Sequence, residues 1–298
     1  MMSMTMEERE KWFEILEKTG KGREAKLAQR VIPKDYCQYM EQVTREEIQI
    51  EVPAVGVPVR CIISRAHDKS ENCPVHINLH GGGFIFKQDQ DDDWYCAHIA
   101  AGIHGIVIDV DYATSDNYAY PVAFEQSYEV VRWVSRHCSD LGADPQRISI
   151  GGHSAGGCLA AAISLRAAKE KDIQICLQIL DYAANDNYAP LLDEKQERSR
   201  ALSMLYADGD AELLKNPYVS PAFATSDMMH GLPRALIINA KNCPFCHINE
   251  SYGMKMIEAG VEVKMRRYIN SRHGFTVRLS GEWREAQNLI IREIMDVK

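Results

Sequence analysis

A short glycine-flanked run around Ser154 has the pattern of a nucleophile elbow. Gly152, His153, Ser154, Ala155 and Gly156 follow an apolar stretch that predicts a strand, and they lead directly into a helical pattern. A serine on so sharp a strand-to-helix turn needs neighbours without side chains two positions before and after it. The helix that follows directs its first N–H groups toward developing negative charge. We therefore expect a nucleophilic serine; the alternative is a glycine-rich turn in which Ser154 only caps the helix.

Three consecutive glycines end the apolar run at 75–80. Glycines cost packing and chain entropy, so their presence here favours a close approach of backbone N–H groups to a ligand. With a serine nucleophile downstream, the N–H groups of Gly82, Gly83 and Ala155 are the expected oxyanion hole, each worth ~3 to 4 kcal/mol to the transition state. A phosphate-binding loop fits less well, because no Lys-Ser or Lys-Thr pair follows. His80 is expected to orient the loop rather than to act as a base.

His273 is the candidate general base. Of the ten histidines, it is the one that follows the last predicted strand, at 261–268. This position matches the chain order serine, acid, histidine that accompanies a nucleophile elbow. We expect His153, next to the serine, to have no catalytic role.

Four motifs stand in a characteristic order and spacing: HGGGF at 80–84, GHSAGG at 152–157, NPYVSP at 216–221 and HGF at 273–275. Together they resemble the hormone-sensitive-lipase-like carboxylesterases, also called the HGGG or fold-3 family, of the α/β-hydrolase fold. The resemblance covers nearly the whole chain from about residue 45. It implies Ser154 as nucleophile, His273 as general base, the oxyanion donors named above, and hydrolysis of small carboxylic esters without a cofactor.

One departure from the family pattern concerns the catalytic acid. The family usually places a catalytic carboxylate after the seventh strand, where this sequence has Cys243, followed by Cys246 and His247. The C-x-x-C-H spacing also matches haem attachment, a redox dithiol or part of a zinc site. Haem attachment requires export, a thioredoxin dithiol follows the first strand of its fold, and zinc needs a fourth ligand. We therefore expect no metal, and interpret both cysteines as incidental residues of a strand-to-helix loop.

A thiol cannot balance the charge of an imidazolium as a carboxylate does. Asp181 ends a predicted strand at 175–181, next to the strand that usually carries the acid, and is the expected partner of His273. Asp186, Glu250 or no effective acid are the alternatives. Two functions follow. The first is a serine esterase that works through an acyl-enzyme; the other is a hydrolase-fold protein that binds a small ligand with little or no turnover.

Elements that would position these residues alternate along the chain. Eight apolar runs predict strands, the first two as a hairpin, and helical patterns lie between the later ones. This alternation predicts a single α/β domain with a mostly parallel eight-stranded sheet. Residues 1–45 contain two amphipathic helical stretches, at 6–20 and 22–43, and predict a cap segment before the hydrolase domain at 46–298. An irregular, proline-containing segment at about 185–229 predicts a cap or lid insertion.

Composition restricts the partners. The 298 residues carry a net charge of −8 and a pI near 5.7, with no cluster of basic residues, so a small ester is favoured over nucleic acid. We expect no membrane span, because no apolar stretch approaches 18 to 20 residues. Nine cysteines and no secretion signal at the N-terminus favour a reducing, cytoplasmic location. The sequence leaves open whether the chain forms a homodimer.

Overall fold

An eight-stranded sheet forms the centre of the computed structural model, which describes residues 4–20 and 32–297. The strands are β1 (Val43–Ile50), β2 (Val59–Ala66), β3 (Cys73–Leu79), β4 (Ile106–Asp111), β5 (Ala143–His153), β6 (Leu177–Asp181), β7 (Arg234–Asn242) and β8 (Val263–Arg272). Their order is β1-β2-β4-β3-β5-β6-β7-β8. β2 is antiparallel to both β1 and β4, and all other neighbours are parallel. The predicted hairpin and mostly parallel sheet are therefore confirmed.

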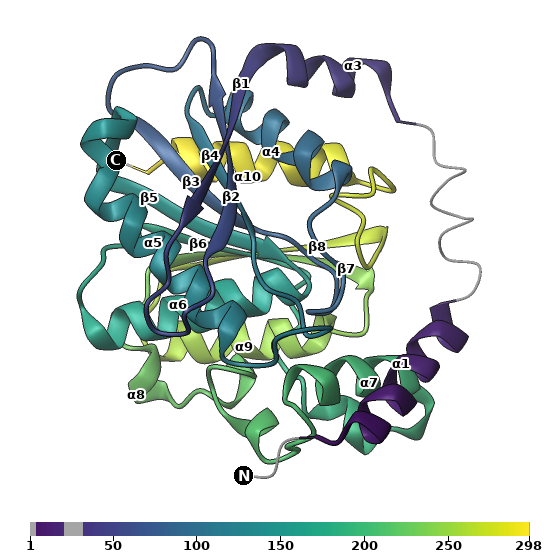
Figure 1. Cartoon of the computed structure of the whole chain (residues 1–298). Helices are drawn as coiled ribbons and strands as arrows, with labels where there is room; N and C mark the ends of the chain where they lie inside the picture. The colour runs from purple at the N-terminus through teal and green to yellow at the C-terminus, as the bar shows by residue number, and fades with distance from the viewer. Residues whose placement is uncertain (1–3, 21–31, 298) are drawn as a thin grey trace.

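Helices cover both faces of the sheet (Figure 1). The helices of the described residues are α1 (Met6–Gly20), α3 (Lys34–Cys37), α4 (Gln90–Gly102), α5 (Val122–Leu141), α6 (Ala155–Glu170), α7 (Glu197–Tyr206), α8 (Ser226–Met229), α9 (Cys246–Glu258) and α10 (Trp283–Met295). α5, α6 and α9 pack on one face, and α4 and α10 on the other. Across 4–20 and 32–297, no helix combines the length and apolar character needed to cross a bilayer.

Burial on both faces explains why the strands are continuously apolar. In β7, Ala235 and Ile237 belong to the core beneath α5, α6 and α9, whereas Leu236 and Ile238 belong to the core beneath α4 and α10. Successive side chains of a strand point to opposite faces, so a strand covered on both sides needs apolar residues at every position.

The candidate site residues all follow the carboxyl ends of parallel strands. The glycine loop follows β3, Ser154 follows β5, Cys243 follows β7 and His273 follows β8. Parallel strands end at the same edge of the sheet, which is where open α/β sheets bind ligands. The topology alone thus gathers these four segments.

The N-terminal helix packs against the insertion. Leu16 of α1 is buried together with Ala201 and Leu205 of α7, and Arg198 donates a 2.9 Å hydrogen bond to the Leu16 carbonyl. Figure 1 shows α1 and α7 side by side below the sheet. Around α7 and α8, the insertion consists of short 3-10 turns: η2 (Ala189–Leu192), η3 (Glu194–Gln196), η4 (Leu213–Lys215) and η5 (Pro221–Phe223).

The first part of the second predicted N-terminal helix, at 22–43, lies outside the described residues, which resume at residue 32. Its described part forms only α3 and the 3-10 turn η1 (Gln38–Gln42). β1 already begins at Val43, within the segment predicted to be helical. A role of α1 and the insertion as a cap stays a prediction.

Candidate active site

The chain turns sharply at Ser154, between the last residue of β5 and the first residue of α6. Ser154 has a φ of 54° and a ψ of −112°, a region that residues with a side chain rarely adopt. Backbone atoms crowd this turn: a Cβ added at Gly156 would lie 1.9 Å from the Leu79 carbonyl oxygen. Position 156 therefore has to be glycine, and the predicted strand–turn–helix element is confirmed.

The glycine loop after β3 lies beside the elbow. A Cβ added at Gly81 would lie 3.8 Å from the Ser154 Cβ. Gly82 has a φ of +123°, and a Cβ there would come within 2.5 Å of the Phe86 carbonyl oxygen. The structure thus brings the loop carrying Gly82 and Gly83 next to the serine.

His80 supports this loop. Its Nδ1 lies 2.7 Å from the Gly81 carbonyl oxygen, and its ring stacks on Tyr112 at a centroid distance of 4.0 Å. The Tyr112 hydroxyl donates a hydrogen bond to the His80 carbonyl. Burial lowers the pKa of His80 to about 4, so its ring is neutral at neutral pH. These contacts agree with the expected orienting role.

His273 follows β8 and reaches the serine. Its Nε2 lies 2.9 Å from Ser154 Oγ, although the two residues are 119 positions apart in the chain. Two aromatic rings contact the imidazole edge-on: Tyr182, with ring centroids 4.9 Å apart, and Phe245, with centroids 5.4 Å apart. The expected pairing of serine and histidine is therefore present.

Cys243 faces the other nitrogen of the imidazole. Its Sγ lies 3.1 Å from His273 Nδ1. The side chain is buried, and burial raises the pKa of this thiol to about 12, so it is uncharged at neutral pH. The interpretation of Cys243 as an incidental loop cysteine is therefore wrong. Its position after the seventh strand was the signal, because that is where the family places its acid.

Asp181 does not occupy the position expected for it. Its Oδ2 lies 3.0 Å from His153 Nδ1 and accepts a short hydrogen bond from Thr276 Oγ1. The prediction that Asp181 orients the His273 ring directly is wrong. The reason is strand parity: Leu177 and Ile179 point toward α4 and α10, and Asp181, two positions further, points the same way. Burial raises the pKa of the Asp181 carboxyl group.

The two alternative carboxylates have other partners. Asp186 accepts hydrogen bonds from the backbone N–H groups of Tyr188 and Ala189, as in a local turn. Glu250 forms a two-pronged ion pair with Arg267, which lowers its pKa. Neither side chain takes the place of the missing acid.

The C-x-x-C-H residues point to different partners. Cys246 Sγ lies 3.5 Å from Glu250 Oε1, and the His247 side chain is 90% exposed. Cys243 meets His273 instead. Within the described part of the chain, no three His, Cys, Asp or Glu side chains gather so as to hold a metal ion.

The α7 helix of the insertion touches the glycine loop. A Cβ at Gly83 would lie 2.6 Å from the Leu202 side chain, so Leu202 covers this glycine. The ring of Tyr206, at the end of α7, stacks on Phe84 with centroids 3.7 Å apart. The insertion therefore packs directly against the glycine loop.

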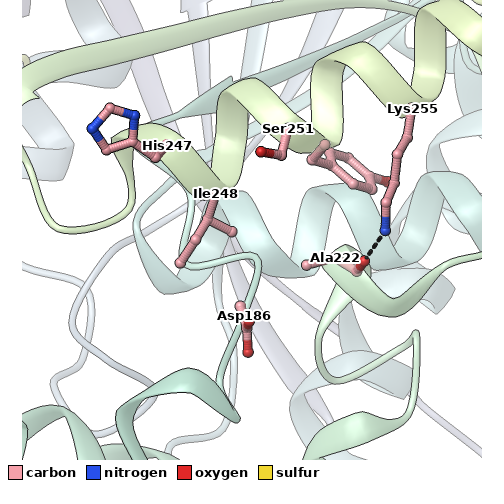
Figure 2. A pocket seen from close by; sticks show the side chains of 7 residues that line it. Asp186, Ala222, His247, Ile248, Ser251 and Lys255 are labelled. Atoms are coloured by element: carbon pink, nitrogen blue, oxygen red, sulfur yellow. Dashed lines mark hydrogen bonds between the residues drawn. The ribbon is translucent and has the colours of Figure 1, made fainter. Parts of the chain in front are cut away.

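A surface depression of about 270 Å³ lies between the loop after β6, η5 and α9. Its lining includes Asp186, His247 and Lys255, and Lys255 donates a hydrogen bond to the Ala222 carbonyl (Figure 2). Ser154, His273 and Cys243 are not among its lining residues. The depression is therefore distinct from the serine–histidine pair.

Comparisons with known proteins agree with this geometry. A family model described as the alpha/beta hydrolase fold matches residues 76–277. Esterase LipI of Mycobacterium tuberculosis is 32% identical over 240 residues, which cover 77% of this chain and 74% of that protein. An arylesterase of Saccharolobus solfataricus is 26% identical over 260 residues, covering 84% and 81% of the two chains.

A solved structure is similar over the full length. The hyperthermophilic esterase of the archaeon Pyrobaculum calidifontis superposes with a TM-score of 0.80 at 25% identity and covers 100% of both chains. The chain therefore belongs to the hormone-sensitive-lipase-like carboxylesterase family of α/β hydrolases, as the four motifs predicted.

Proposed function

We propose that this protein hydrolyses small carboxylic esters through an acyl-enzyme on Ser154. The observation that carries the proposal is the 2.9 Å contact between Ser154 Oγ and His273 Nε2, on a strained elbow beside a glycine loop. Relatives named esterase, carboxylesterase and arylesterase support the same reaction.

The reaction starts with proton transfer from Ser154 Oγ to His273 Nε2 as the oxygen attacks the ester carbonyl. Negative charge then develops on the carbonyl oxygen, where the N–H groups of Gly82, Gly83 and Ala155 would stabilise it. His273 next protonates the departing alcohol and afterwards activates water to release the acid. Every step uses side chains and backbone of this chain, so the proposal needs no cofactor.

Cys243 sets this site apart from a site with a carboxylate. The neutral thiol contacts His273 Nδ1 and restrains the ring, but it carries no charge to balance the imidazolium that forms when Ser154 loses its proton. We therefore expect slower turnover than in a relative that has an acid at this position.

The same contact favours one second candidate function. A hydrolase-fold protein with an uncharged partner on its histidine could bind a small ester or acid with little turnover. Binding without acylation of Ser154 would support this function.

Reaction with p-nitrophenyl acetate tests the proposal. We expect a burst of p-nitrophenol stoichiometric with protein, and labelling of Ser154 by a fluorophosphonate, both absent in Ser154→Ala. Ser164→Ala is the matched control, because Ser164 is a buried serine within α6 whose hydroxyl donates to the Ala160 carbonyl one turn earlier. A folded protein that is neither labelled nor acylated would leave only the binding function. A cytoplasmic location and a homodimer stay predictions.

A further inference from the structure

We propose that Asp181, Thr276 and Tyr182 form a positioning network that holds His273 against Ser154 without touching the reacting atoms. The inference rests on the proposed function, because it concerns the same serine–histidine pair. It explains how the imidazole can stay in place although its direct partner, Cys243, is a weakly hydrogen-bonding thiol.

The hydrogen bonds of the network have one direction. Thr276 Oγ1 donates to Asp181 Oδ2, so the oxygen of the same hydroxyl is left to accept from the Tyr182 hydroxyl, 2.7 Å away. His153 Nδ1 donates to the same Asp181 oxygen over 3.0 Å. Thr276 and His153 therefore both donate to one Asp181 oxygen, and Tyr182 donates to Thr276. This chain of hydrogen bonds fixes each hydroxyl in a single orientation.

One member of this network, Thr276, belongs to the segment that carries His273. Thr276 lies three residues after His273, and its carbonyl accepts a 2.9 Å hydrogen bond from Gln287 Nε2 on α10. Its side chain and its backbone are thus held from two different elements. Because Thr276 is fully buried, breaking either bond would leave a polar group without water.

Tyr182 connects the network to the imidazole itself. Its hydroxyl bonds Thr276, and its ring contacts the His273 ring at an interplanar angle of 65°. Its backbone has a φ of +38°, which is unfavourable for a residue with a side chain, and its N–H donates a 2.7 Å hydrogen bond to the Ile238 carbonyl. An unfavourable backbone held by surrounding bonds is a common feature of functional sites.

Asp181 also binds the nucleophile through its backbone. The Ser154 N–H donates a 3.0 Å hydrogen bond to the Asp181 carbonyl, while the Asp181 side chain holds Thr276. One residue therefore fixes the elbow and the histidine loop relative to each other. This dual contact is the reason to assign positioning to Asp181 rather than a purely structural role.

Substitutions at Thr276 test the proposal. Thr276→Val keeps the shape but removes the hydroxyl, and we expect kcat for p-nitrophenyl acetate to fall about 10-fold or more, with KM within about 3-fold, since misorientation affects the chemical step. Thr276→Ser keeps the hydroxyl and should stay within about 3-fold of the parent in kcat. Equal loss in Val and Ser, or no loss in Val, would overturn the network.

Tyr182→Phe provides a second variant in case Thr276→Val does not fold. It removes only the hydroxyl that bonds Thr276, so we expect a smaller fall in kcat, roughly 3- to 10-fold. Tyr252→Phe is the matched control, because Tyr252 is equally buried and its hydroxyl has no hydrogen-bond partner in the described structure. If kcat is the same in both phenylalanine variants, the network has no positioning role.

The imidazole resonances of His273 separate this inference from the proposed function. They are assigned in 15N-histidine-labelled protein by their loss in His273→Gln. We expect them to shift in Thr276→Val and to stay in place in Tyr252→Phe. A parent protein that never acylates Ser154 would refute the proposed function, but the His273 resonances would still test the positioning network. Unchanged resonances in Thr276→Val would overturn the network.

Discussion

Replacing Cys243 by Asp should accelerate the reaction. The Sγ atom lies 3.1 Å from His273 Nδ1, so a carboxylate at this position would stand next to the charge that develops on the ring. Two opposite charges about 4 Å apart attract each other by ~4 kcal/mol at an effective dielectric constant of about 20. This attraction exists only after Ser154 has given up its proton, so it lowers the barrier rather than the ground state.

A lowering of the barrier by ~4 kcal/mol corresponds to roughly 10³-fold in rate, close to the ~10⁴-fold effect of the acid in serine proteases. The full attraction requires the new carboxylate to lie where the Sγ atom lies now. We therefore expect kcat to rise by about 10- to 10³-fold in Cys243→Asp. Because the position is buried, the free energy of unfolding should fall by about 1 to 3 kcal/mol.

The assay is the steady-state hydrolysis of p-nitrophenyl acetate at neutral pH, with thermal unfolding measured in parallel. Cys243→Asn is the matched control, because it has the shape of Asp without its charge, and it should show no gain. A folded Cys243→Asp variant that is no faster than Cys243→Asn would refute the argument that the missing charge limits turnover.

Three further predictions follow from the described contacts. Cys246→Ser should retain esterase activity within a few-fold, and metal analysis of the parent should find no stoichiometric zinc or iron, because the Cys246 thiol contacts Glu250, whereas the thiol that contacts His273 is that of Cys243. Gly156→Ala should abolish labelling of Ser154 by a fluorophosphonate, since the added Cβ would lie 1.9 Å from a backbone oxygen; full labelling would contradict the elbow geometry. Burial raises the pKa of the Asp109 carboxyl group to about 7 in the folded protein, compared with about 4 in the unfolded chain. Protonation of this group therefore stabilises the fold: the contribution is complete below about pH 4 and is lost as the pH rises through about 7. Asp109→Asn should thus gain thermal stability relative to the parent between pH 5 and 8, and equal melting curves at pH 8 would disprove it.

Much of the site could be predicted because its signals are local. The elbow needs glycine at position 156, because a Cβ there would lie too close to the Leu79 carbonyl oxygen. This requirement can be recognised from the five consecutive residues at 152–156. Strand positions were predictable for a similar reason, since strands covered on both faces must be apolar at every residue. The parallel order then places Ser154, Cys243 and His273 at one edge of the sheet.

The roles of the polar side chains at that edge could not be predicted. The strand that ends at Asp181 lies next to the one that usually carries the acid, but proximity of strands does not fix the direction of a side chain. Thr276 and Tyr182 carry no recognisable motif, and their hydrogen bonds connect positions 94 or 95 residues apart.

The sequence by itself determined the fold family, the elbow at Ser154, the glycine loop and the histidine that follows the last strand, because each depends on backbone requirements of neighbouring residues. Only the tertiary structure decided which group meets His273 Nδ1. That choice depends on strand parity, which turns Asp181 toward α4 and α10, and on the loop after β7, which brings the neutral thiol of Cys243 to within 3.1 Å of the ring.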